Sequence, residues 1–384
     1  MRIGIDGRAL TGRFTGDRTY WLNLTRDHIE ASDDGDNEYV VYTRLPMPEG
    51  ALPPSPRVTV RSIPASNDRI WTLATFPKAL RQDHIDVAHT QYSTPLRAPC
   101  PVITTVHDIS FRLYPEWFPR KHRILLNLSV PVAMRRAARV ITDSMSSRRD
   151  ILRVYRLPIE HVEAIPLAAA PAYRPVARDQ ARDHVRQRFG LEEPYVVSVG
   201  VLQPRKNLPM LVEAFARAVQ ASAIPHRLVL AGKRGWAYDE IVVQAARLRV
   251  SDRLLLTDYI EDAELPFLYS AADMMAFPSL YEGFGLPPLE AMACGAPTVV
   301  SDAPAMPEVA GEGALVLPVM DATAWSDAIV VLAESKAERA RWSCAGLERS
   351  RAFSWATTGA LTRRVYAEVA ARSHSSSDPT PPPA

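Results

Sequence analysis

The chain contains few cysteines and no long apolar run. Its three cysteines, Cys100, Cys294 and Cys344, lie far apart in 384 residues and form no C-x-x-C pair. This spacing argues against a disulfide framework or a zinc site and fits a reducing cytoplasm. The first residues have no signal-peptide apolar region, and no apolar stretch is long enough to span a bilayer. We therefore expect a cytoplasmic protein.

The charge is also nearly balanced, at +2, which gives no electrostatic indication of a nucleic-acid partner. No carboxylate cluster stands out as a metal ligand, and no protein nucleophile stands out. The length favours two domains over one, and a hydrophobic content of 47% is enough for two cores.

Short apolar runs alternate with longer amphipathic segments along most of the chain. The runs are 38–43, 57–63, 85–89, 101–106 and 139–142, followed by 195–199, 227–231, 253–256, 274–277 and 297–300. This alternation predicts parallel sheets with helices on both faces, in an α/β fold with two successive Rossmann-like domains. A proline-punctuated stretch without clear periodicity, Ala168 to Arg182, indicates the boundary between them.

Two carboxylates follow the predicted strand 274–277. Glu282 precedes Gly283-Phe284-Gly285-Leu286-Pro287, and Glu290 lies in the helical pattern that starts at Pro287. Glycines allow a tight turn and close approach to a ligand, and proline suits a first helical turn. Open α/β sheets bind ligands at this end of their strands. The alternative is that Glu290 only complements a helix N-terminus and Glu282 is a solvated turn residue.

Two adjacent cations follow the first strand of the second predicted domain. Arg205 and Lys206 come after Gly200, and a helix is expected to open at Leu208. The free amides of a helix N-terminus favour anions, and a guanidinium matches phosphate oxygens. The segment predicts a diphosphate site; the alternative is a pair of solvated surface cations.

These motifs resemble those of glycosyltransferase family 4, whose members are retaining and use nucleotide sugars. The resemblance covers roughly residues 1–371 and rests on the Glu282–Glu290 spacing and on Arg205-Lys206-Asn207. It implies a GT-B fold with its active site in an interdomain cleft. The implied parts are an N-terminal acceptor domain (1–172), a C-terminal nucleotide-sugar domain (173–352), a helix crossing back (353–371) and a disordered tail (372–384).

The resemblance also implies residue roles. His107 and Glu282 would act on the donor sugar and its cationic transition state. Arg205, Lys206 and Gly16 would bind the donor diphosphate. The nucleotide and sugar would be held by Glu290, Phe284, Gly285, Leu286 and Gly200, with Glu290 on the ribose hydroxyls. We expect no metal, because two cations can neutralise the diphosphate, and no cofactor besides the donor.

One loop departs from the family pattern. Arg18 stands where the family usually has a second glycine after Gly16, which puts the usual contacts of this loop in doubt and could indicate an anionic acceptor. Basic residues, Arg120 to Arg123 and Arg135 to Arg139, bracket an apolar segment. They are either a solvated helix flank or a peripheral contact with the inner membrane face.

We therefore predict a retaining, metal-independent hexosyltransferase, mannosyltransferase-like, acting in polysaccharide or glycoconjugate synthesis. Its partners would be a nucleotide-sugar donor and a glycan or lipid-linked glycan acceptor. The alternatives are another GT-B activity, such as a nucleotide-sugar epimerase or a phosphorylase, and an inactive binding module. Neither donor nor acceptor identity follows from the residues.

Overall fold

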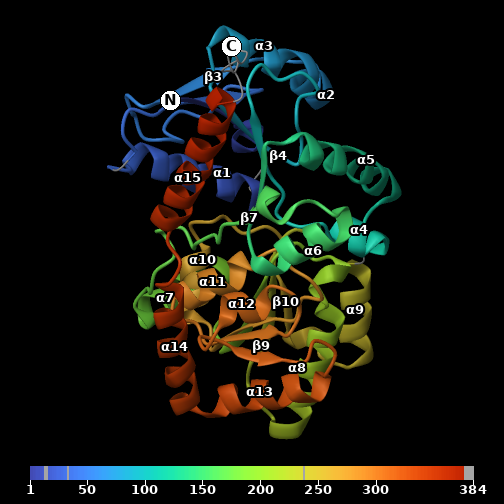
Figure 1. Ribbon diagram of the computed structural model, residues 1–384. Helices are drawn as coiled ribbons and strands as arrows, with labels where there is room; N and C mark the ends of the chain where they lie inside the picture. Colours follow the sequence, from blue (N-terminus) through green and yellow to red (C-terminus); the bar gives the residue numbers. More distant parts are fainter. Residues whose placement is uncertain (13–15, 33, 237, 376–384) are drawn as a thin grey trace, which may run out of the picture. The chain divides into compact units, whose positions relative to one another are not determined.

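The computed structural model describes residues 1–12, 16–32, 34–236 and 238–375 (Figure 1). The chain divides into two compact units. The first comprises Met1–Leu167 and the chain from Trp355 onward, and the second is Ala168–Ser354. Of the predicted disordered tail, residues 376–384 lie outside the described residues.

The first unit is built on a seven-stranded parallel sheet in the order β3-β2-β1-β4-β5-β6-β7. Its strands are β1 (Arg2–Asp6), β2 (Glu38–Thr43), β3 (Val58–Ser62), β4 (Val87–Gln91), β5 (Val102–Thr105), β6 (Arg139–Thr142) and β7 (Val162–Ala164). Its helices are α1 (Gly16–Glu30), α2 (Asp68–Ile70), α3 (Phe76–Gln82), α4 (Ser110–Leu113), α5 (Arg120–Arg136), α6 (Met145–Tyr155) and α15 (Trp355–Ser375).

The second unit has a six-stranded parallel sheet in the order β10-β9-β8-β11-β12-β13. Its strands are β8 (Tyr195–Val199), β9 (Arg227–Ala231), β10 (Leu254–Leu256), β11 (Met274–Phe277), β12 (Thr298–Ser301) and β13 (Leu315–Leu317). Its helices are α7 (Arg178–Phe189), α8 (Leu208–Ser222), α9 (Tyr238–Arg247), α10 (Leu265–Ala271), α11 (Leu286–Ala293), α12 (Met306–Ala310), α13 (Ala322–Glu334) and α14 (Lys336–Ser350).

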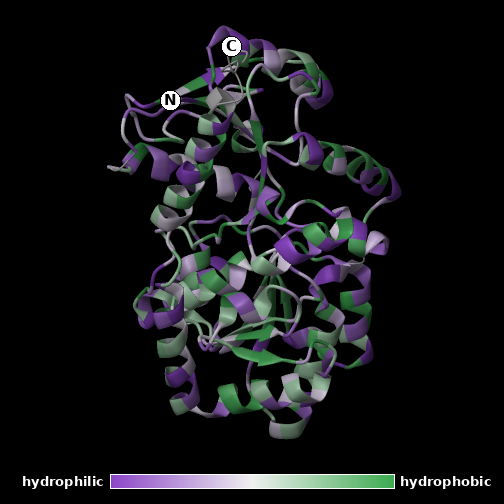
Figure 2. Ribbon diagram, in the orientation of Figure 1, coloured by the Kyte–Doolittle hydropathy of each residue, from purple (hydrophilic) through white to green (hydrophobic). Residues whose placement is uncertain are grey.

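The cores explain why these runs form central strands. All four residues of β11 are buried, and so are all four of β5. Neither strand therefore has the alternation of buried and exposed residues that is typical of a strand with one face in solvent. Strands covered by helices on both faces read as continuous apolar runs. Figure 2 shows the hydrophobic colouring of the strands in the second unit. Trp325 of α13 is fully buried in the core that α8 and the second sheet share.

The last helix, α15, belongs to the first unit. Its Arg363 forms an ion pair with Asp27 of α1 at 2.5 Å. The Tyr366 hydroxyl lies 2.7 Å from His89 Nδ1, and both side chains are fully buried. A buried polar contact of this kind fixes the helix because its loss leaves unpaired groups in the core. No helix among the described residues is long and apolar enough to cross a membrane.

Candidate active site

The carboxyl ends of β8 and β11 bring the predicted cationic and acidic residues together in the second unit. Arg205 and Lys206 lie on a short 3-10 turn, Pro204–Lys206, immediately before α8. The Leu280 amide donates to the Arg205 carbonyl at 2.8 Å, which ties this turn to the loop that carries Glu282. These neighbouring strand ends form one edge of the sheet, where such folds place ligands.

Glu282 is paired with both cations. Its Oε2 accepts from Arg205 Nη1 at 2.6 Å, and its Oε1 accepts from Lys206 Nζ at 2.7 Å. Glu282 is 7% exposed and Lys206 8%. Burial alone would raise the pKa of Glu282, but Arg205 and Lys206 outweigh it and lower that pKa, so the carboxylate is ionised. The alternatives of a solvated turn residue and solvated surface cations do not describe this ion-paired triad, in which Glu282 and Lys206 are buried and Arg205 is partly buried.

Gly200 allows Lys206 to approach the end of β8. Its φ is +148°, and a Cβ built there would lie 3.2 Å from Lys206 Cε. Lys206 Nζ also lies 4.4 Å from the centroid of the Phe277 ring at the end of β11, a cation–π contact. A side chain at position 200 would therefore strain the backbone and crowd the lysine stem.

The predicted turn and helix after Glu282 form as a buried segment. Gly285 has a φ of +121°, and a Cβ there would clash with the Met306 side chain. Phe284 is buried and packs edge-to-face against Phe353, with ring centroids 5.8 Å apart. Leu286 is the first residue of α11. Phe284 thus contributes packing, which positions the backbone of this turn.

Glu290 lies one residue further into its helix than predicted. Because α11 starts at Leu286, Glu290 is its fifth residue and begins the second turn. It is 7% exposed, and burial and the nearby Asp262 raise its pKa to about 8. The hydroxyls of Tyr173 and Tyr269 act in the opposite direction. A carboxyl in this environment carries its proton at neutral pH.

In the first unit, His107 follows β5 and contacts several polar side chains. Its Nδ1 lies 2.7 Å from Asp143 Oδ2, and its Nε2 lies within hydrogen-bond distance of Gln91 Nε2. Asp17 of α1 is 3.7 Å from the same Nε2. Burial lowers the pKa of His107, but the carboxylates of Asp143, Asp17 and Asp108 raise it, and these charges together favour a value of about 9.

The other predicted loop residues lie close by in sequence. Gly16 is exposed and begins α1. Arg18 donates from Nε to the Leu10 carbonyl at 3.3 Å. A cavity of about 440 Å³ in this unit is lined by Asp6, Arg8, Ala9, Thr11, Gly12, Asp17, Arg44, Leu45, Asp68, Gln91 and Tyr92.

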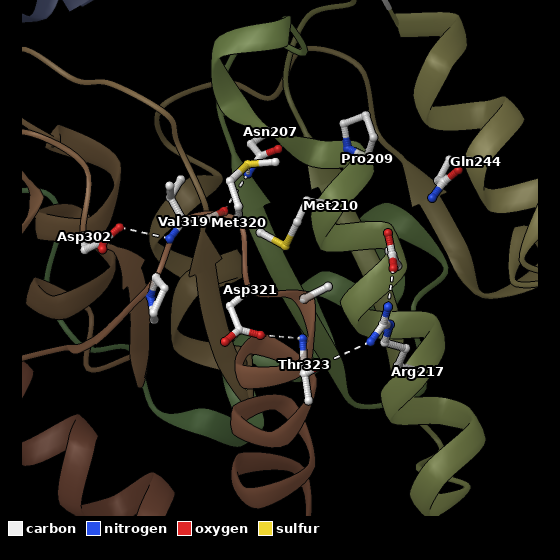
Figure 3. Close-up of a pocket in the computed structure, with 13 residues that line it drawn as sticks. Asn207, Pro209, Met210, Arg217, Gln244, Asp302, Val319, Met320, Asp321 and Thr323 are labelled. Carbon is white, nitrogen blue, oxygen red and sulfur yellow. Dashed lines mark hydrogen bonds and ion pairs between the residues drawn. The ribbon is translucent and has the colours of Figure 1, made fainter.

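A second cavity, of about 830 Å³, lies beside the N-termini of α8 and α13 (Figure 3). Asn207, which follows Lys206, lines it and donates through its side chain to the Val319 carbonyl at 2.9 Å. This bond ties the cationic turn to the loop after β13. Elsewhere in the cavity Arg217 is already paired with Glu213 at 2.6 Å. Within the described part of the chain, no three His, Cys, Asp or Glu side chains are grouped so as to hold a metal ion.

Several of these partners were missed from the sequence. Tyr173 and Tyr269 near Glu290 are separated from it by 117 and 21 positions. Gln91 ends β4 and Asp143 follows β6, whereas His107 follows β5. The sequence signal that could have identified Gln91 and Asp143 is their position, since each stands at the end of a strand. The sequence predicted the two segments that carry these residues, but it did not predict that Glu282 pairs with Arg205 and Lys206.

Comparisons with known proteins agree with this architecture. The family model described as glycosyl transferases group 1 matches residues 179–349, and that described as Glycosyltransferase Family 4 matches residues 23–171. O-antigen chain mannosyltransferase B of Escherichia coli is 32% identical over 265 residues, which cover 69% of each chain. O-antigen chain mannosyltransferase RfbU of Salmonella typhimurium is 31% identical over 230 residues, 59% of each chain.

Solved structures with the same fold have lower identity. Sucrose-phosphate synthase from Thermosynechococcus elongatus has a TM-score of 0.73 at 22% identity, covering 97% of this chain and 100% of that one. Anabaena HepE in complex with UDP and glucose has a TM-score of 0.72 at 19% identity, covering 95% and 99%. These solved structures share the GT-B fold with this chain. The chain belongs to glycosyltransferase family 4, group 1, and has mannosyltransferase relatives.

Proposed function

We propose that this glycosyltransferase moves a mannosyl unit from a nucleoside-diphosphate sugar to a glycan hydroxyl, with retention of anomeric configuration. The observation that carries the proposal is the ion-paired triad of buried Lys206 and Glu282 with partly buried Arg205, at the carboxyl end of β8 and β11. Two cations and one carboxylate in a confined site match a donor that has an anionic diphosphate and a sugar. Named relatives supply the mannosyl assignment.

The donor would exchange partners with Glu282. Arg205 and Lys206 would bind the diphosphate oxygens through charge-assisted contacts and stabilise the negative charge that develops as the sugar departs. Glu282, displaced from them, would accept hydrogen bonds from the sugar hydroxyls and support the positive charge at the anomeric carbon. Because two cations already serve the phosphates, transfer would need no metal.

The nucleotide would be held at Glu290. Ribose hydroxyls donate to a carboxylate at comparable sites in other α/β folds. Since Glu290 has a pKa raised to about 8, this role requires the loss of its proton when the nucleotide binds. The flanking turn, with Gly200, Gly285 and Leu286, would bring backbone close to the donor.

His107 would act from the first unit on the donor sugar. An imidazole at this position can accept a hydrogen bond from a sugar hydroxyl or face the developing oxocarbenium ion. Asp143 holds its Nδ1, which orients the ring. Gly16 would present its backbone to the donor phosphate. The hydrogen bond from Arg18 Nε to the Leu10 carbonyl holds this part of the arginine side chain against the protein.

We further propose that the acceptor is lipid-linked and that α5 rests on anionic lipid. Its exposed face carries four large aliphatic side chains, of which Leu128 is 68% exposed; the others are Ile124, Leu125 and Val132. The sequence of α5 contains four arginines and a lysine and no carboxylate. Aliphatic side chains between cations suit the interface of an anionic bilayer.

Vesicle sedimentation tests this surface. Wild-type protein should sediment with phosphatidylglycerol vesicles, less with phosphatidylcholine vesicles, and less again in high salt. Leu128→Glu should reduce binding, whereas Val243→Glu, which changes an exposed valine on α9, should not. Equal binding of Leu128→Glu and wild type would exclude α5 as the contact.

The function is tested with a panel of UDP, GDP, dTDP and ADP sugars. Thermal shifts identify the donor, and mass spectrometry identifies the product. A mannosylated glycan supports the proposal. Free sugar, an epimerised donor or transfer to inorganic phosphate would instead show one of the other GT-B activities, and binding without any product would show an inactive module.

A further inference from the structure

Four polar side chains form a continuous row that includes His107 and runs from Trp21 through Gln91 and His107 to Asp143. Trp21 Nε1 donates to Gln91 Oε1 at 2.8 Å. The Gln91 amide nitrogen contacts His107 Nε2, and His107 Nδ1 is 2.7 Å from Asp143 Oδ2. Trp21 is fully buried and Asp143 is 3% exposed, so water has little access to either end of the row.

The chemistry of these groups sets the direction of each hydrogen bond. An indole N–H can only donate, so the oxygen of the Gln91 amide must face Trp21. Its NH₂ group therefore faces His107, and that group also can only donate. His107 Nε2 must then accept and carry no proton, which leaves the ring proton on Nδ1, where Asp143 accepts it.

We propose that Gln91, held by Trp21, is a positioning residue that keeps His107 as a neutral imidazole with its lone pair on Nε2. A proton on Nε2 would face the hydrogens of the Gln91 amide. Turning that amide over would not help, because its NH₂ group would then face the Trp21 N–H. Either arrangement leaves two donors facing each other in a partly buried site, which is costly.

Other groups around His107 also affect its protonation, and three of them oppose the effect of Gln91. The carboxylates of Asp143, Asp17 and Asp108 favour an imidazolium and, without the constraint from the Gln91 amide, raise the pKa of His107 to about 9. The rings of Tyr20 and Tyr92 lie edge-on, with centroids 5.1 and 5.7 Å away, and burial raises the pKa of both hydroxyls, so they add no charge.

His89, the remaining titratable neighbour, is also neutral at ordinary pH, because burial lowers its pKa to about 3. The protonation of His107 is therefore a balance between three carboxylates and one amide. Of the carboxylates, Asp143 is satisfied by the neutral Nδ1–H form, and Asp17 has a side chain that is 51% exposed, so water screens it.

The consequence for catalysis rests on the proposed function. An imidazolium beside the donor sugar would oppose the positive charge that develops at the anomeric carbon. A neutral ring paired with Asp143 leaves a net negative charge nearby and can accept a hydrogen bond from a sugar hydroxyl. Gln91 and Trp21 would thus act on the reaction through His107, without contact with the donor.

Nitrogen NMR of full-length protein labelled with ¹⁵N-histidine tests the proposal without substrate. The chain has nine histidines, so His107→Asn identifies the His107 signals. Wild type should show one protonated and one unprotonated His107 nitrogen at neutral pH. In Gln91→Glu the carboxylate can accept from both Trp21 and Nε2–H, so both nitrogens should be protonated. Gln187→Glu, the same change at an exposed position, should match wild type.

Two spectra would overturn the proposal. One is an imidazolium in wild type at neutral pH, and the other is a neutral ring in Gln91→Glu. Gln91→Met, which removes the amide without adding charge, provides a second variant and should raise the pKa of His107.

If the spectra are as expected, Gln91→Glu should also slow transfer at least tenfold with donor KM nearly unchanged. Wild type without transfer from any donor would contradict the proposed function, while the spectra would still decide the role of Gln91.

Discussion

Glutamine in place of Glu282 is expected to tighten the binding of a nucleoside diphosphate while slowing sugar transfer. In the free protein the carboxylate accepts from Arg205 Nη1 at 2.6 Å and from Lys206 Nζ at 2.7 Å. A diphosphate that binds these cations must first displace Glu282. The neutral amide of glutamine has nearly the same shape but competes less for the two cations.

The size of the effect follows from those two contacts. Hydrogen bonds to charged groups contribute roughly 1.5–3 kcal/mol each. Part of this free energy is recovered in the wild-type protein when the displaced Glu282 carboxylate accepts new hydrogen bonds from hydroxyl groups. We therefore expect a net gain of about 1.4–3 kcal/mol, or roughly ten- to 150-fold in Kd. Transfer should slow, because the group that supports the cationic transition state is lost.

Isothermal titration calorimetry with the product nucleotide measures this change. Glu213→Gln is the matched control, since it removes the exposed partner of Arg217 in the same unit and should leave Kd unchanged. The melting temperature of free Glu282→Gln should fall, because buried Lys206 and partly buried Arg205 lose their counter-charge, and nucleotide should restore it. Nucleotide binding that is equal or weaker in Glu282→Gln would refute the exchange of partners.

Four further outcomes are expected. Arg205→Ala and Lys206→Ala should each weaken donor binding by roughly 1.5–3 kcal/mol, and unchanged affinity in both would contradict the phosphate assignment. Stability should fall as pH rises from about 5 to 8, since Glu290 binds its proton more tightly in the folded state, and Glu290→Gln should flatten this slope in urea titrations. Transfer should persist in EDTA; a loss that Mg²⁺ or Mn²⁺ reverses would show a metal requirement. Ending the chain before Trp355 should abolish cooperative melting, whereas removing 376–384 should not change the transfer rate.

The sequence predicted most of the fold because the strands are short, largely apolar runs that alternate with longer amphipathic segments. The bounds predicted for β2, β6, β8, β9 and β11 agree with the structure. β7 and β13 were not predicted. Each has three residues and lies at a sheet edge, where a short strand offers little apolar pattern. Their pairing depends on the neighbouring strand rather than on local propensity.

The site was predicted as segments but not as contacts. Glycine spacing and a helix start identified the turns that carry Arg205 and Glu282, yet periodicity contains no information about which side chains meet across two turns. The pairing of Glu282, the proton on Glu290 and the amide beside His107 all depend on tertiary distances. Resemblance supplied the roles of these residues, and the structure supplies their charge states.

The anomeric configuration of the product tests the central claim most directly. With the donor identified by thermal shift and a glycan acceptor, proton NMR of the first product formed should show the α or β configuration of the donor sugar. That outcome, together with transfer in EDTA, would establish a retaining, metal-independent glycosyltransferase. A product of opposite configuration would contradict the mechanism assigned to Arg205, Lys206 and Glu282.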